Sequence, residues 1–123
     1  MTMAYWCVLV AGLLPYVAAL AAKLGVPYDN HDPRAWLARL TGWRSRADAA
    51  QHNGFEAFPL FAVAVIVAQL AGVGQGRVDA LAGGFVAVRV AHFAAYVADI
   101  PTLRSILWFV GLACILGLFI SAA

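Results

Sequence analysis

The stretch AAQHNGFEAFPLFAVAVIVAQLAGV, residues 49–73, contains a single charged side chain, that of Glu56. A helix that crosses a bilayer needs about 20 mostly apolar residues, and this stretch is long enough. Ionisable side chains inside hydrocarbon are costly unless they face a partner or a water-filled site. The stretch therefore predicts a membrane-spanning helix with a polar cluster, Asn53 and Glu56, near its beginning.

Three other stretches of the chain have the same apolar character, at roughly residues 3–24, 78–98 and 105–122. Of the 123 residues, 64% are hydrophobic and 11% are charged, and the mean hydropathy is +0.85. This composition is too apolar for a soluble domain of this length. We expect an all-α integral membrane protein with one four-helix domain over residues 1–123. The first span has no basic leader and is expected to remain as a helix.

Basic residues are concentrated between the first two spans, and Arg77 is the only one in the turn after the second. Those between the first two spans are Lys23, Arg34, Arg39, Arg44 and Arg46. Loops rich in Lys and Arg stay on the cytoplasmic side. We expect the long first loop to be cytoplasmic and both termini to lie on the opposite side. The net charge of +2 implies no nucleic-acid partner.

The long first loop has helical spacing of its own at residues 33–43, with Asp32 placed to cap and Pro33 at the first helical position. Trp36 and Trp43 suit headgroup depth. We expect a short helix on the cytoplasmic interface that anchors the protein, with a substrate lid as the alternative. Residues 45–48, Ser-Arg-Ala-Asp, resemble a capping box and predict that the next helix begins near Arg46.

Prolines and cysteines fall inside the predicted spans. Pro15 frees the carbonyl of Ala11, and Pro59 lies just beyond Glu56. Cys7 and Cys114 are isolated thiols in apolar helices and are expected to be small core residues without a disulfide or a metal. His31, His52 and His92 are scattered, which gives a metal site little support.

Polar residues recur at helical spacing near one end of the predicted bundle. Residues three, four or seven apart share a helix face, so Asn53 pairs with Glu56, and Arg89 with His92 and Tyr96. Helix direction places both groups, together with Arg104 and Ser105 at the start of the fourth span, in the cytoplasmic half of the bilayer.

Two interpretations of this cluster stay open. Glu56 and Arg89 have opposite charges and can pair across two helices to hold the bundle in register. The full set of polar groups instead favours a binding site for a polar, anionic ligand that enters from the cytoplasm. Serine or cysteine nucleophile triads lack their partners, because Ser105 has no base beside it in the sequence.

The chain resembles the MAPEG family of membrane proteins in eicosanoid and glutathione metabolism. The resemblance rests on the four spans, on residues 51–61 (QHNGFEAFPLF), and on Arg89-x-x-His92-x-x-x-Tyr96 followed by Arg104-Ser105. The resemblance implies a left-handed four-helix bundle that forms a homotrimer, with glutathione bound between adjacent subunits near the cytoplasmic face. It also implies a lipophilic small-molecule substrate that arrives from the lipid bilayer.

The resemblance also assigns roles to residues. Asn53 and Glu56 correspond to the residues that bind the glutathione backbone and amino group, Gln51 assists, and His92 and Tyr96 line the same pocket beside Arg89. Arg104 corresponds to the arginine that activates the thiol, and Ser105 is its neighbour. These positions are the candidate catalytic and glutathione-binding residues.

Two positions depart from the family pattern. Active relatives have an arginine where this chain has Ala49, and leukotriene C synthase has a tyrosine where this chain has Ala57. Arg46, two turns before Asn53 on the same helix face, is a candidate replacement for the missing arginine. The leading hypothesis is a glutathione-dependent transferase or peroxidase.

Two other function classes compete with it. One is a non-catalytic protein of the same fold, either an accessory subunit of a larger membrane complex or a lipid binder. The other is proton or ion transport along Glu56, Arg89 and His92, which has little support from four short helices.

Overall fold

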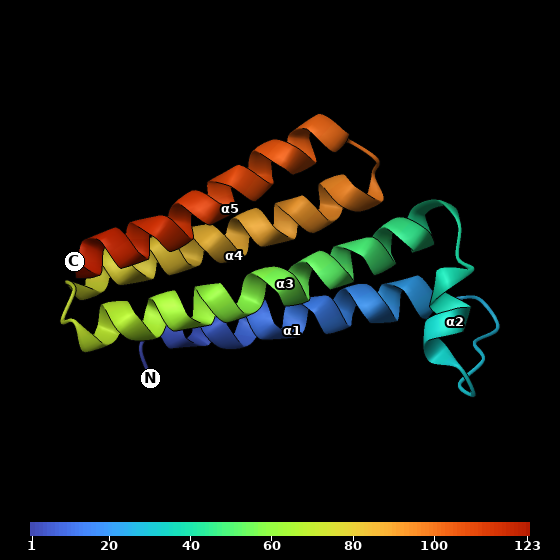
Figure 1. Cartoon of the computed structure of the whole chain (residues 1–123), viewed down its shortest axis with the longest axis horizontal. Helices are drawn as coiled ribbons and strands as arrows, with labels where there is room; N and C mark the ends of the chain where they lie inside the picture. Colours follow the sequence, from blue (N-terminus) through green and yellow to red (C-terminus); the bar gives the residue numbers. More distant parts are fainter.

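A computed structural model describes all of residues 1–123 and consists of helices joined by short connections (Figure 1). The helices are α1 (Met3–Lys23), α2 (Pro33–Ala38), α3 (Gly42–Leu70), α4 (Gln75–Val97) and α5 (Pro101–Ala122). The 4 long ones are long and apolar enough to cross a membrane. The predicted all-α, multi-pass membrane architecture is therefore confirmed.

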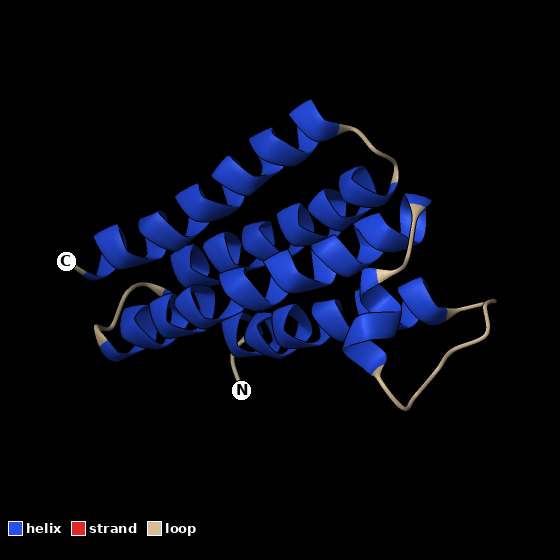
Figure 2. Cartoon of the chain, turned by 45° about the vertical axis from the view of Figure 1, so that its right-hand side comes forward, coloured by secondary structure: helices blue, strands red, loops and turns tan.

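The four long helices run side by side, and the connections divide the bundle into two ends (Figure 1). We call the end with both termini and the α3–α4 turn the terminal end, and the end with α2 and the α4–α5 turn the loop end. Helix α1 packs against α3 and α4, while α5 packs against α4 and α3. The long loop thus lies at the opposite end from both termini, and the prediction that this end faces the cytoplasm stays a prediction. In Figures 1 and 2, α5 inclines away from α3 toward the loop end.

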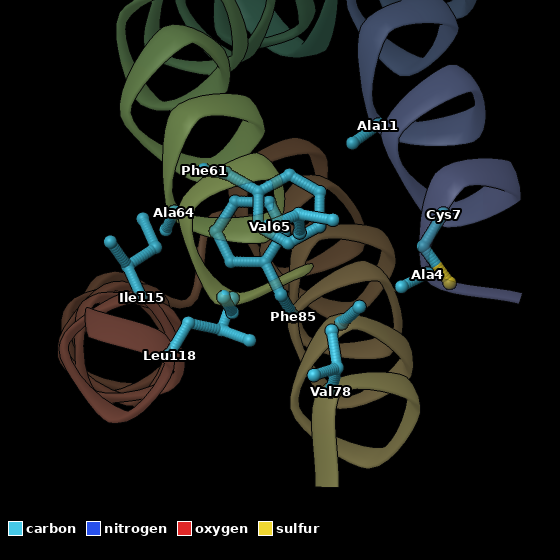
Figure 3. Close-up of a cluster of buried hydrophobic side chains, with 12 residues drawn as sticks. Ala4, Cys7, Ala11, Phe61, Ala64, Val65, Val78, Phe85, Ile115 and Leu118 are labelled. Carbon is cyan, nitrogen blue, oxygen red and sulfur yellow. The ribbon is translucent and has the colours of Figure 1, made fainter. Parts of the chain in front are cut away.

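The core lies where all four long helices meet, closer to the terminal end (Figure 3). Phe61 of α3 and Phe85 of α4 stack at its centre, with ring centroids 3.9 Å apart and planes inclined by 14°. Leu118 of α5 closes one side, and Cys7 of α1 lies on the other. Val65, Val78, Ile115 and five buried alanines fill the remaining positions, and the alanines allow close helix approach, which drives helix association in lipid. The prediction that Cys7 is a core residue is confirmed.

Helices α1 and α3 touch most closely where a proline meets a glycine. A Cβ atom on Gly54 would lie only 2.8 Å from Cγ of Pro15. The glycine therefore leaves room for the proline ring, and Pro15 is itself fully buried. Asn53 is the neighbour of Gly54 in α3, so the candidate amide lies directly beside this contact.

Helix boundaries at the loop end differ from the sequence-based predictions. Helix α2 ends at Ala38 instead of residue 43, and Trp43 belongs to α3. Residues 39–41 separate the two helices: Thr41 is extended as the N-cap of α3, and Gly42 begins α3 with a left-handed φ of +63°, which favours glycine. The capping-box prediction was wrong: α3 already begins at Gly42, after Thr41.

The last helix also begins earlier than the predicted span. Pro101 occupies the first turn of α5, a position that suits proline because it needs no N–H donor there. As a result Arg104 lies inside a formed helix, and its backbone N–H donates to the carbonyl of Ile100 over 3.0 Å.

The terminal end is closed by polar contacts that involve α1. The Oδ1 atom of Asp79 accepts from the backbone N–H of Ala4 and from Nε2 of Gln75, each over 2.8 Å. Oγ1 of Thr2 accepts from Nε2 of Gln69 over 3.0 Å. The bond from Ala4 satisfies a backbone donor at the start of α1 that the helix itself leaves free.

Candidate functional site

The loop half of the bundle contains a pocket built from α3, α4 and α5. Its volume is about 200 Å³, and we call it the polar pocket. It is lined by Asn53, His92, Tyr96, Arg104, Ser105, Trp108 and Phe109. Five of these seven residues are candidates from the sequence, contributed by three helices. These five side chains therefore converge on one pocket, as expected from the sequence.

A second pocket of about 170 Å³ continues toward the core, and we call it the apolar pocket. It shares Asn53 and Trp108 with the polar pocket and adds the charged residues Glu56 and Arg89. Its remaining lining is apolar: Ala57, Leu60, Phe85, Gly111, Leu112 and Ile115. The two pockets together form a path between α3 and α5, polar at the loop end and apolar toward the membrane centre.

Arg104 is held over an aromatic ring at the mouth of this path. Its guanidinium carbon lies 4.5 Å from the ring centroid of Tyr96. The tyrosine ring in turn meets His92 edge-to-face, with centroids 5.5 Å apart. A guanidinium stacked on an aromatic face keeps its N–H edge available for an anion. The spacing of four residues between His92 and Tyr96 allows this contact on one face of α4.

Arg89 is bound by an amide and not by a carboxylate. Its Nη2 atom donates to Oδ1 of Asn53 over 2.8 Å, and the residue is only 8% exposed. The interpretation in which Glu56 and Arg89 form an ion pair is not borne out, because no carboxylate lies within 4.0 Å of Arg89. The one such contact in the protein joins His52 to Asp48, and it is an ion pair only when the histidine is protonated. Glu56 instead lines the apolar pocket with an exposed side chain, so its carboxylate remains available to a ligand.

Two candidates from the sequence lie outside both pockets. Arg46 donates through Nε to the carbonyl of Val97 over 3.1 Å, which ties α3 to the end of α4. Gln51 has a buried Oε1 atom with no hydrogen-bond partner.

Sequence analysis missed Trp108, which lines both pockets. The spacing of four residues from Arg104 could have identified Trp108 from the sequence, because it puts both side chains on one face of α5.

The donor set suits a ligand with both anionic and cationic groups. Guanidinium, phenol, amide and hydroxyl groups face the polar pocket, and a carboxylate stands at its inner edge. His92 is 2% exposed, and its Nδ1 atom has no partner within the protein. No group of three or more His, Cys, Asp or Glu side chains is arranged to hold a metal ion.

The fold and the pocket define a class: a multi-pass membrane protein of four long helices with a polar site near one end of the bundle. Residues 3–123 match the model of the MAPEG family, and the chain belongs to that family. The family includes glutathione-dependent transferases and peroxidases as well as non-catalytic members. A search of curated proteins found no match, and neither did a search of solved structures.

Proposed function

We propose that the protein is a glutathione-dependent membrane transferase or peroxidase that acts on a lipophilic electrophile. One observation carries the proposal: Asn53, His92, Tyr96, Arg104 and Ser105, from three helices, line a single pocket. An ion-pair role in holding the bundle together would not bring an arginine, a hydroxyl and an amide to one cavity. Membership of the MAPEG family supports the same activity class.

Arg104 is the residue we assign to thiol activation. A free thiol has a pKa of about 8.5, and only its thiolate is nucleophilic. A guanidinium beside the sulfur favours the anion, and each unit of pKa lowering corresponds to about 1.4 kcal/mol. The face of Tyr96 holds the guanidinium in place, and Ser105 adds a hydroxyl donor from the next position of α5.

The reaction then depends on the electrophile that the apolar pocket admits. With an aryl halide, sulfur forms a bond to carbon, the halide leaves, and the thiol proton passes to solvent. With a hydroperoxide, two molecules of glutathione give one disulfide, one alcohol and one water. Leu60, Leu112 and Ile115 offer a lipophilic group an apolar surface beside the polar pocket.

Glu56, Arg89 and Asn53 are proposed to bind the non-reacting parts of glutathione. The exposed carboxylate of Glu56 suits its ammonium group, and the guanidinium of Arg89 suits a carboxylate. The side chain of Glu56 is exposed in the single chain, and an exposed carboxylate on a spanning helix is costly in lipid. This cost supports the proposed homotrimer, in which another copy covers α3. Gln51 and Arg46 are then candidates for contacts completed by that copy.

The test uses the purified protein in lipid nanodiscs with millimolar glutathione and an aryl halide. We expect glutathione to raise the unfolding temperature and the conjugate to form. S-methylglutathione is the matched control, since it keeps every binding group but has no thiol. It should stabilise the protein and give no product. The proposal would be contradicted if glutathione gave no stabilisation and no turnover.

A specific observation favours a second candidate, a non-catalytic membrane protein of this fold. Ala57 lines the apolar pocket where an active relative has a tyrosine, and Arg46 is bonded to Val97 and faces neither pocket. Part of the expected glutathione clamp is therefore missing. This candidate predicts stable co-purification of other membrane subunits or of lipid, together with no response to glutathione.

A further inference from the structure

A third cavity lies within the bundle, between α1, α3 and α4, and we call it the core cavity. Its volume is about 30 Å³. It is lined by Ala11, Leu14, Pro15, Val17, Ala18, Ala50, Gly54, Phe58, Phe85, Arg89, His92 and Phe93. A cavity needs at least about 10–15 Å³ to hold a water molecule, and it holds one only where polar partners are present. The core cavity is large enough for one water and too small for a substrate.

The first polar partner is a backbone carbonyl. Pro15 has no N–H, so the carbonyl of Ala11 has no α-helical donor four residues later. Ala11 is 5% exposed and lies on the wall of the cavity. A backbone carbonyl without a donor in the membrane interior costs several kcal/mol, of the order found for any buried unsatisfied polar group.

The second polar partner is Arg89, which lines both the core cavity and the apolar pocket. A guanidinium has five N–H donors, and the only side-chain hydrogen bond of Arg89 is to Asn53. No carboxylate lies within 4.0 Å of it, since the sole ion pair in the protein is elsewhere. A buried cation in this setting needs further hydrogen-bond acceptors.

We propose that the core cavity binds one ordered water molecule, which accepts from the guanidinium of Arg89 and donates to the carbonyl of Ala11. An apolar occupant would leave both groups unsatisfied, and a metal cation would be repelled by Arg89. The water links the segment of α1 at Pro15 to Arg89, the arginine that donates to Asn53. Pro15 is thereby a positioning residue for the inner edge of the polar site, although it touches neither of the two larger pockets.

Two measurements on the full-length protein in lipid test this site. The first is density at a resolution that shows waters, which requires no variant. The second is labelling by hydroxyl radicals generated from bound water by X-rays, read at Phe93 and Leu14 on the cavity wall. Leu9, an exposed leucine of the same helix that does not line the cavity, gives the background.

The variant for both measurements is Pro15→Val, which restores the backbone N–H at similar side-chain volume. Pro59→Val is the matched control, because Pro59 is also an intramembrane proline but lines none of the three cavities. We expect a density peak within hydrogen-bond distance of both groups. Labelling of Phe93 should fall to background in Pro15→Val and remain in Pro59→Val.

Three results would overturn the proposal: an empty cavity in the wild-type density, density for a lipid chain there, or equal labelling of Phe93 in wild type and Pro15→Val. None of these readouts involves glutathione. A failure of the proposed water and a failure of the proposed enzyme are therefore separate results.

Discussion

At the terminal end of the bundle polar side chains bond to one another, whereas at the loop end they face a pocket. Asp79 and Thr2 each accept hydrogen bonds that close the start of α1. In the loop half, Arg104 and His92 face a cavity of about 200 Å³. All of the buried side-chain polar atoms that lack a partner belong to residues in this half: Arg44, Asp48, Gln51 and His92.

The difference separates two uses of polar groups in a membrane. Satisfied polar groups between helices contribute modestly to stability, about 0.6 kcal/mol on average in measured cases. Polar groups that face a cavity leave hydrogen-bonding capacity for a ligand, and they are retained in membranes mainly for function. Substitutions of pocket-facing groups that have no partner within the protein should therefore change activity more than stability, and substitutions of bonded groups at the terminal end should do the reverse.

The largest expected effect is at Arg104. We expect Arg104→Ala to lower kcat for conjugation by about 10²–10³-fold, the usual loss when one preorganised electrostatic contact is removed. The unfolding temperature should change little, because the side chain of Arg104 rests on the face of Tyr96 and makes no hydrogen bond or ion pair within the protein. Arg104→Lys keeps the charge without the planar fork and should give an intermediate rate. Arg39→Ala, on the exposed loop, is the control, and equal rates for Arg104→Ala and Arg39→Ala would remove the catalytic assignment.

The next largest effect is expected at Asn53, which accepts a hydrogen bond from Arg89 and also lines the polar pocket. Asn53→Leu leaves the buried guanidinium of Arg89 without its side-chain acceptor. Hydrogen bonds to charged groups contribute about 1.5–3 kcal/mol, and we expect a loss of that size in the free energy of unfolding. Unfolding equilibria in nanodiscs measure it. The double variant Asn53→Leu, Arg89→Leu should recover most of the loss, and no recovery would show that the pair is not coupled.

A smaller effect is expected at Gly54, where α3 packs against Pro15 of α1. Gly54→Ala places a Cβ atom 2.8 Å from Pro15 Cγ, which requires a backbone shift. Overpacking of this kind costs about 1–3 kcal/mol. Gly76→Ala is the matched control, since nothing lies within 4 Å of a Cβ there. Thermal unfolding should separate the two variants, and Pro15→Ala should relieve the loss in Gly54→Ala.

Hydrophobic composition predicted the four spans, and helical spacing predicted the convergence of Asn53, His92, Tyr96 and Arg104. Both succeed because helix geometry fixes which residues share a face. The partner of Arg89 was not predictable in this way. Asn53 and Glu56 lie on the same face of α3, and the choice between them depends on the rotation and tilt of α3 in the packed bundle, where Gly54 contacts Pro15 of α1. That contact joins residues far apart in the sequence.

The loop end was also harder to predict than the spans. The pattern at residues 33–43 has helical spacing across Leu40 and Trp43, yet α2 ends at Ala38 and a new helix begins at Gly42, which has a left-handed φ. A glycine in a helical pattern does not reveal its φ from sequence alone. Asp79 was overlooked as a structural residue because its acceptor role depends on the start of α1, which is brought beside it only by the fold.

The smallest expected effect is at Asp79, and it tests the terminal end alone. Asp79→Ala removes the side-chain acceptor at the start of α1, and loss of such a cap costs about 0.5–2 kcal/mol. Asp79→Asn keeps an acceptor oxygen and should lose less, as read from unfolding equilibria in nanodiscs. Neither variant should alter stabilisation by glutathione, because Asp79 lines none of the three cavities. If Asp79→Ala abolished glutathione binding while folding normally, the two ends would be coupled through α4, and their separation into structural and functional halves would be wrong.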